Sequence, residues 1–189
     1  MLFDPVTTEV ERPRWSSLSQ DKSMDSIRRR PSNSMLDIPS YISGYVDGEG
    51  CFCVSLRPQP RIKVKWEVRP SFSVSQNSER AELIQLLPHV FGGGSIRPDR
   101  SDKTLKFEIR SLDLLVERVV PFFEAFPLMS SKRNDFQHFK SVCCLMTQRA
   151  HLTPQGIIAI TELVERMNSS GLRRYDLGMI RVSVNEVKG

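Results

Sequence analysis

Glu49 is the residue of this sequence whose surroundings most clearly favour chemistry. It lies between Gly48 and Gly50, so its carboxylate is sterically open and the chain can turn sharply beside it. Gly44 precedes Gly48 by four residues, which places both on one face of a helix and allows a second backbone to approach closely. If that helix docked on a copy of itself, two such acids would meet at one end. Paired carboxylates repel each other unless divalent cations lie between them.

A carboxylate beside a backbone carbonyl makes a hard-oxygen site of the kind that Mg2+ prefers. We expect the Glu49 carboxylate and the Gly48 carbonyl to bind Mg2+, in a site that would hydrolyse phosphodiesters by activating water and stabilising the leaving 3′ oxygen. The alternative is that Glu49 only caps a helix end or a turn. A negative side chain at a helix C-terminus opposes the helix dipole, and this cost favours a functional role.

Alternating polarity predicts a basic surface on one face of a sheet. Between residues 61 and 75, apolar side chains including Ile62, Trp66 and Phe72 fall on one face and polar side chains on the other. The outward positions of four predicted strands, which we expect to bind DNA, are Ser55, Arg57, Arg61, Lys63, Lys65, Glu67, Arg69, Ser71, Ser73, Arg97, Lys106, Glu108 and Arg110. Basic side chains bind guanine O6/N7 or phosphate, and the two glutamates could accept from cytosine N4. The alternative is an ordinary solvated face of mixed charge.

The predicted elements give an α+β domain with the order αββαββα, followed by one or two more helices. Periodicity and capping residues predict a helix from Pro39 to Val46 or Asp47, strands at about 52–57 and 62–75, a helix from Ser78, strands at 95–97 and 104–110, and helices at about 111–120, 132–148 and 153–167. Antiparallel hairpins with helices on one face make a two-layer fold. Residues 179–187 alternate only weakly, which predicts a short strand or disorder.

The nine residues from Ile42 to Gly50 resemble the signature of the LAGLIDADG homing endonucleases. Gly44, Asp47 and Gly50 match the family letters, and Glu49 replaces the second Asp. The resemblance extends over about residues 38–170. It implies the LAGLIDADG endonuclease fold with a saddle-shaped sheet, and a site-specific double-strand DNA endonuclease that cuts a long target, leaves short 3′ overhangs and is encoded in a mobile intron or intein.

The resemblance also implies supporting residues near the acid. Gln76 stands where a family glutamine positions the nucleophilic water, and Lys132 resembles a family basic residue that stabilises developing charge. The alternative for Lys132 is a solvated residue in a first helical turn. Asp47 is expected to be structural, through capping or hydrogen bonding at docked helix ends.

The signature motif occurs once, which predicts a homodimer. One motif supplies one acid, whereas cutting two strands requires two active sites. We expect the dimer axis to follow the helix that carries Ile42, Gly44, Tyr45 and Gly48, and the target to be pseudo-palindromic. The rival is a non-catalytic binder on the same fold, either a maturase that binds intron RNA or a transcription regulator. A plain protein-interaction domain would leave the basic strand faces unexplained.

Composition sets the remaining expectations for this chain of 189 residues. Its net charge is +5, and residues 1–37 hold six basic and six acidic residues, so the excess lies further along the chain and favours a polyanionic partner. We expect residues 1–37 to form a disordered tether, 38–172 the folded domain and 173–189 a C-terminal tail.

Four cysteines without metal-ligand spacing indicate reduced thiols in an intracellular protein of the cytoplasm, the nucleoid or an organelle, not a secreted one. We expect no contact with a membrane, because no apolar run is long enough to span one.

Overall fold

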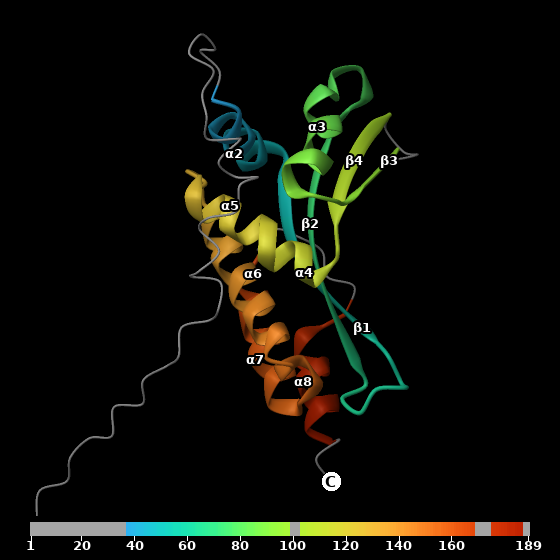
Figure 1. Cartoon of the computed structure of the whole chain (residues 1–189). Helices are drawn as coiled ribbons and strands as arrows, with labels where there is room; N and C mark the ends of the chain where they lie inside the picture. The colour runs from blue at the N-terminus through green and yellow to red at the C-terminus, as the bar shows by residue number, and fades with distance from the viewer. Residues whose placement is uncertain (1–36, 99–102, 169–174, 187–189) are drawn as a thin grey trace, which may run out of the picture. The chain divides into compact units, whose positions relative to one another are not determined.

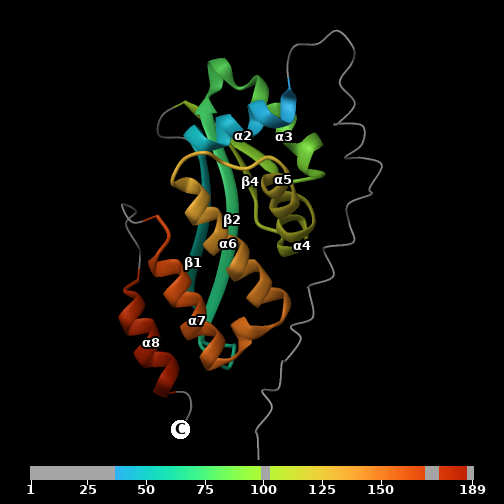
Figure 2. The same ribbon diagram turned by 90° about the vertical axis from the view of Figure 1, so that its left-hand side faces the viewer.

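One antiparallel sheet and a layer of helices make up the domain. The computed structural model describes residues 37–98, 103–168 and 175–186, so the predicted tether lies outside the described residues except for Asp37. The strands are β1 (Gly50–Pro58), β2 (Trp66–Asn77), β3 (Ser95–Pro98) and β4 (Thr104–Ile109), in the order β1-β2-β4-β3. Within the described residues, helices cover one face of this sheet and leave the other uncovered (Figures 1 and 2). The predicted α+β class is confirmed.

The helices follow the predicted order, and several begin at predicted caps. They are α2 (Ile38–Glu49), α3 (Glu82–Phe91), α4 (Leu112–Leu114), α5 (Val120–Ala125), α6 (Lys132–Thr147), α7 (Pro154–Glu165) and α8 (Leu177–Glu186), with a π-helical turn (Leu115–Val119) joining α4 to α5. Ser111 accepts a hydrogen bond from the Leu114 N–H, and Thr153 accepts one from the Gly156 N–H. Among the described helices, none is both long and apolar enough to cross a bilayer.

A cluster of phenylalanine side chains fills the space between the sheet and the helices. Phe52 of β1 is fully buried, and its ring centroid lies 5.2 Å from those of Phe72 on β2 and Phe136 on α6. Phe91 of α3 and Phe123 of α5 extend the same cluster. Aromatic pairs at these separations add to the free energy gained from burial, so the cluster fixes the helices on the inner face.

The second strand begins later than the sequence pattern predicts. Residues 59–65 form a tight turn in which the Gln59 N–H donates to the Lys65 carbonyl (2.7 Å). Lys65 has a φ of 61°, a left-handed conformation that interrupts an extended chain. Arg61, Lys63 and Lys65 are therefore exposed loop residues at the tip of the β1–β2 hairpin, and their predicted strand positions are wrong.

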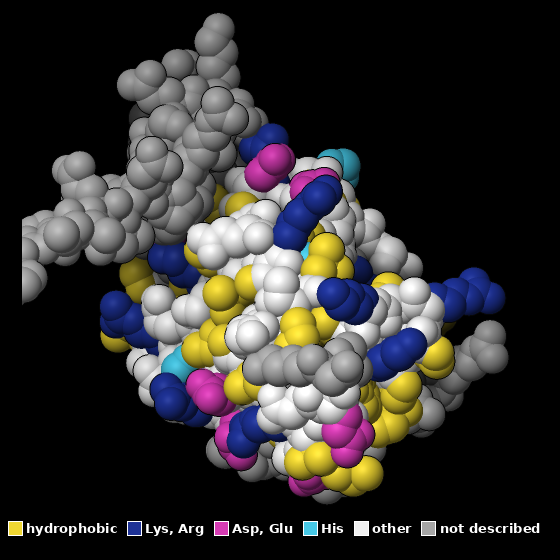
Figure 3. Space-filling model, turned by 90° about the horizontal axis from the view of Figure 1, so that it is seen from below, with side chains coloured by type: hydrophobic (Ala, Val, Ile, Leu, Met, Phe, Trp, Pro, Cys, Tyr) yellow, Lys and Arg dark blue, Asp and Glu magenta, His cyan; other side chains and the backbone are white. Residues whose placement is uncertain are grey.

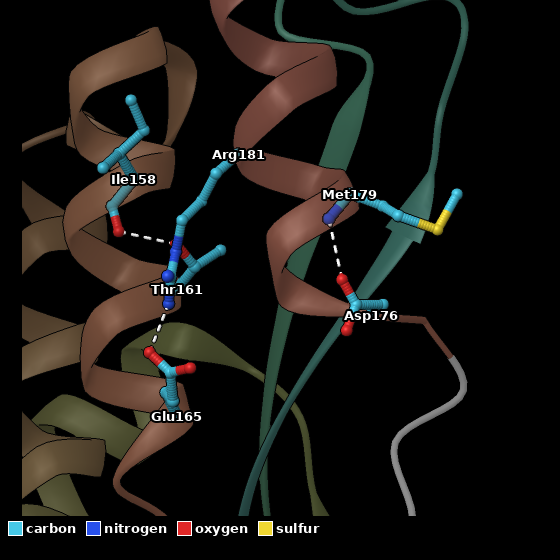
Figure 4. Close-up of polar contacts among 6 residues, drawn as sticks. All are labelled: Ile158, Thr161, Glu165, Asp176, Met179 and Arg181. Atoms are coloured by element: carbon cyan, nitrogen blue, oxygen red, sulfur yellow. Dashed lines mark hydrogen bonds and ion pairs between the residues drawn. The ribbon is translucent and has the colours of Figure 1, made fainter.

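The C-terminal residues form a helix where a strand or disorder was predicted. Leu177, Ile180 and Val184 are buried at helical spacing, and the Asp176 carboxylate accepts from the Met179 N–H (2.9 Å) at the start of α8. Arg181 joins α8 to α7, since its Nε donates to the Thr161 hydroxyl (3.1 Å) and its guanidinium pairs with Glu165 (Figure 4). Because these side-chain bonds connect the two helices, α8 is part of the folded domain.

Candidate active site and nucleic-acid interface

The end of α2 is fastened to the segment that leads into α6. The Asp47 carboxylate accepts hydrogen bonds from the Met129 N–H (2.9 Å), the Ser130 N–H (2.9 Å) and the Ser130 hydroxyl (2.6 Å). Asp47 is thus structural, as predicted, but its partners lie within the same chain. The helix continues to Glu49, two or three residues past its predicted end, and then passes directly into β1.

Lys132 closes the same end of the helix. Its ammonium donates to the carbonyl oxygens of Val46 (2.9 Å) and Gly48 (3.2 Å). The last carbonyls of a helix have no partner within the helix, and a lysine that binds them stabilises the extra turn. The structure therefore brings Lys132, predicted as a catalytic residue, against Gly48, predicted as a metal ligand.

Glu49 differs from Asp47 because its carboxylate is exposed. Among the described residues, no side chain forms a hydrogen bond or an ion pair with it. Gly50, which follows it, has no room for a side chain, since a Cβ there would lie 2.5 Å from Val46 Cγ1 and 2.7 Å from the Val46 carbonyl oxygen. The close turn from α2 into β1 leaves the Glu49 carboxylate at the surface.

Gln76 approaches this end of α2 from β2. Its side-chain oxygen accepts from the Asn77 N–H (2.8 Å), and its amide lies near the Tyr45 hydroxyl without forming a well-aligned hydrogen bond. Tyr45 precedes Glu49 by one helical turn, so Gln76, Tyr45 and Glu49 lie at the same end of the sheet.

The two sides of this site differ in their electrostatics. Burial raises the pKa of Asp47, but hydrogen bonds from Ser130 and Met129 and the nearby Lys132 ammonium outweigh it and hold that pKa below its usual value. Burial raises the pKa of the Tyr45 hydroxyl, Gln76 lowers it, and the Glu49 carboxylate adds to the rise. Asp47 is therefore an anion held by donors, and Tyr45 is a neutral neighbour of Glu49.

The outer face of α2 is open with respect to the described residues. A Cβ added at Gly44 or Gly48 would meet nothing within 4 Å, and Tyr41 on the same face is 51% exposed. Ile42, predicted to be at a subunit interface, is fully buried in the core, so that prediction is wrong. The apolar positions of a helix divide between its two faces, and burial shows that Ile42 belongs to the inner one.

The uncovered sheet face carries most of the residues predicted to bind DNA. Directly paired residues lie on the same face, and the pairs Arg57–Glu67, Ser55–Arg69 and Arg97–Lys106 hold predicted residues on both strands. Among the described residues of this face, the cations are Arg57, Arg69, Arg97, Lys106 and Arg110, against the two carboxylates of Glu67 and Glu108, which leaves three positive charges. By contrast, basic, acidic and apolar side chains are mixed on the surface that Figure 3 shows from below.

Two of the predicted DNA-binding residues are too buried to reach a base. Ser73 is 6% exposed and Glu108 is 8% exposed, and the two are paired across β2 and β4. Their strands are central, so neighbouring side chains cover them even on the outer face. Glu108 instead binds Arg110 (2.9 Å) and Arg97 (3.5 Å).

Sequence reasoning missed the partners of Asp47. The sequence predicted no contact of Asp47 with Ser130 or Met129, and the Met129 side chain is 93% exposed. These residues follow Asp47 by more than 80 positions, and no local pattern indicates a contact over that distance.

A family model described as LAGLIDADG endonuclease matches residues 42–143, more than half of the chain. This chain belongs to the LAGLIDADG endonuclease family. Its sequence is 31% identical over 125 residues to "Probable intron-encoded endonuclease 2" of Neurospora crassa, covering 66% of this chain and 28% of that protein. The predicted family is confirmed.

Solved structures of the LAGLIDADG endonuclease family share the fold. The homing endonuclease I-TnaI is 31% identical with a TM-score of 0.68, and the match covers 79% of this chain and 97% of that one. I-LtrWI, a LAGLIDADG homing endonuclease bound to target DNA, is 34% identical with a TM-score of 0.68, and the match covers 72% of this chain and 46% of that one. The chain thus spans nearly all of one solved relative, about half of another, and less than a third of the Neurospora protein. The predicted LAGLIDADG fold is confirmed.

Proposed function

We propose that this protein is a site-specific double-strand DNA endonuclease that acts as a homodimer with Mg2+. The observation that carries the proposal is the exposed Glu49 carboxylate at the end of a helix whose outer face has no neighbour among the residues that the structure describes. The positively charged sheet face supports double-stranded DNA as the substrate. Relatives named as homing or intron-encoded endonucleases support the same reaction.

The outer face of α2 supports the homodimer. No contact with the described residues requires glycine at positions 44 and 48, because a Cβ at either would meet nothing within 4 Å. Glycine in a helix costs about 1 kcal/mol relative to alanine. The presence of both Gly44 and Gly48 therefore supports close packing of α2 against a second molecule. A second copy of α2 packed on this face would cover Tyr41 and Met129 and bring the two Glu49 residues together at one end.

The oxygen atoms at the end of α2 fit a hard divalent cation. Glu49 supplies a carboxylate, and the Gly48 carbonyl keeps one lone pair free beside its bond from Lys132. In the described part of the chain, no three His, Cys, Asp or Glu side chains gather as a metal site, so further ligands would come from the second copy, the DNA phosphate and water. Mg2+ bound there would supply an activated water and charge stabilisation for phosphodiester hydrolysis.

The residues around Glu49 have separate tasks in this proposal. The Val46 and Gly48 carbonyls hold the Lys132 ammonium, which stabilises the negative charge that develops on the phosphate. Gln76 orients the attacking water, and the Asp47 bonds keep the end of the helix in place.

Cleavage by a Glu49→Gln variant tests the proposal. A target is first selected from a pool of random-sequence DNA duplexes in Ca2+, whose looser coordination favours binding over cutting. We expect the wild type to cut that target in Mg2+ and Glu49→Gln to bind it equally well but cut at least about a thousandfold more slowly. Glu162→Gln, which removes the same charge from an exposed position on α7, is the control. Tight binding without cutting by the wild type would favour the non-catalytic alternative instead.

A further inference from the structure

Glu108 is a buried acid on the outer face of the sheet. Its side chain is 8% exposed, whereas its partners Arg97 and Arg110 are 56% and 54% exposed. Arg110 Nη2 lies 3.1 Å from Oε1 and 2.9 Å from Oε2 of Glu108, and Arg97 Nη2 lies 3.5 Å from Oε2. One buried carboxylate on β4 therefore holds a guanidinium group from β3 and another from Arg110, the residue after β4, while both guanidinium groups remain about half exposed.

Arg110 also borders a small pocket on this face. The pocket has a volume of about 70 Å3 and is lined by Ser55, Arg69, Pro70, Ser71 and Arg110. A space of this size holds a few water molecules, so it suits the edge of a base and excludes a base flipped out of the duplex. Its second arginine also has a carboxylate nearby, since Arg69 Nε lies 4.0 Å from Glu67.

The balance of charge favours a base edge over a phosphate. Guanidinium groups bind either the O6 and N7 atoms of guanine or the oxygens of a phosphate. Glu108 cancels part of the positive charge that would attract a phosphate, but it leaves the directed N–H donors that a neutral guanine edge requires. An acid placed against two arginines therefore weakens general attraction to DNA and fixes the direction of the donors.

We propose that Glu108 is a positioning residue that holds Arg110 for recognition of a guanine edge at the Ser55–Ser71 pocket of each half-site. This inference rests on the proposed function, because it assumes that the outer face of the sheet binds duplex DNA. It replaces the prediction that Glu108 itself accepts from cytosine, which its burial contradicts.

Sequence selection from a random-sequence duplex pool in Ca2+ tests this inference. We expect the wild type and Glu162→Gln, which loses the same charge elsewhere, to enrich the same motif with guanine at one position of each half-site. Glu108→Gln should lose that guanine preference by roughly tenfold, the discrimination that a bidentate arginine contact supplies. Its affinity for unselected duplex should be equal or higher, because a negative charge has been removed.

Arg110→Lys is the second variant, and it leaves the Glu108 carboxylate in place. Lysine keeps the charge but lacks the planar fork, so the same guanine preference should be lost. The inference is overturned if either variant enriches guanine as the wild type does, or if Glu108→Gln weakens binding equally for all sequences. A wild type that enriches no motif would instead overturn the proposed function itself.

Discussion

Asp47 and Glu49 are two residues apart at the end of α2, yet their surroundings differ. Asp47 accepts three hydrogen bonds from Met129 and Ser130, whereas the Glu49 carboxylate is exposed. A carboxylate that already accepts three hydrogen bonds has few lone pairs left for a cation. The hydrogen bonds alone therefore separate a structural acid from a candidate catalytic one.

The stability of the protein should depend on the ionisation of Asp47. Its pKa is lowered in the folded chain, so its contribution is present above the unfolded pKa and is lost as the pH falls through the folded pKa. We expect Asp47→Asn to lower the free energy of unfolding at pH 7 by about 1–2 kcal/mol, as for other hydrogen bonds to a charged group near the surface. Urea unfolding of both proteins from pH 7 to about pH 3 measures this difference.

The difference between wild type and Asp47→Asn should shrink toward the acid end of that range, because the pH there lies below the unfolded pKa of Asp47 and approaches its lowered folded pKa. Glu162→Gln, whose side chain is exposed on α7, should show little difference at either pH. A difference that is the same at pH 7 and pH 3 would show that the charge of Asp47 does not matter.

At the scale of elements, α2 has two faces with different requirements. The inner face is packed in the core through Ile42 and Val46, and the outer face carries Gly44 and Gly48 in open space. Gly156 of α7 is a contrasting helical glycine, because a Cβ there would lie 1.9 Å from the Ala150 carbonyl oxygen. Close packing within the chain therefore requires glycine at position 156 of α7, whereas a Cβ added at Gly44 or Gly48 of α2 would meet no described residue within 4 Å.

Gly44→Leu should separate the subunits without unfolding the chain. A Cβ at position 44 meets no atom of the described residues within 4 Å, and leucine favours a helix over glycine, but the new side chain would hold a second α2 away. We expect sedimentation velocity at micromolar concentration to show a dimer for the wild type and a monomer for Gly44→Leu, with an unchanged far-UV circular dichroism spectrum. Gly156→Ala should remain a dimer, but its free energy of unfolding should fall by about 1–3 kcal/mol because the added methyl group overpacks the core. A Gly44→Leu protein that sediments as a dimer contradicts the proposed interface.

Local sequence patterns predicted most helices and strands but not how deeply individual side chains are buried. Alternation along β2 and β4 correctly placed Ser73 and Glu108 on the outer face, yet it could not show that neighbouring strands bury them. The same alternation extended β2 back to Ile62, because a left-handed residue such as Lys65 leaves no signal in polarity. In α8, a weak alternation concealed Leu177, Ile180 and Val184, whose spacing is helical.

The site itself was predicted in part for a similar reason. The glycine-flanked Glu49 is a local signal, and the family resemblance supplied Gln76 and Lys132. The bonds that join Lys132 to Val46 and Gly48 connect residues more than 80 positions apart, and such contacts depend on the packing of the whole domain.

At the scale of the whole molecule, the proposal requires that each copy of the chain cut one strand. A chain that carries the signature motif once, with one basic sheet face among its described residues, can engage one half of a target. Two copies joined along α2 would present two sheet faces to a long duplex and two acids to its centre. The activity then belongs to the dimer, and each Glu49 is responsible for one phosphodiester bond.

A mixed dimer of wild-type and Glu49→Gln chains tests this account most directly. The two chains are co-expressed with different affinity tags, purified in sequence and incubated in Mg2+ with a supercoiled plasmid that carries the selected target. Agarose gel electrophoresis separates intact, nicked and linear plasmid. The wild-type dimer should linearise the plasmid, the dimer of two variant chains should leave it intact, and the mixed dimer should produce nicked circles. A mixed dimer that linearises the plasmid as fast as the wild type would contradict the assignment of one Glu49 to each strand.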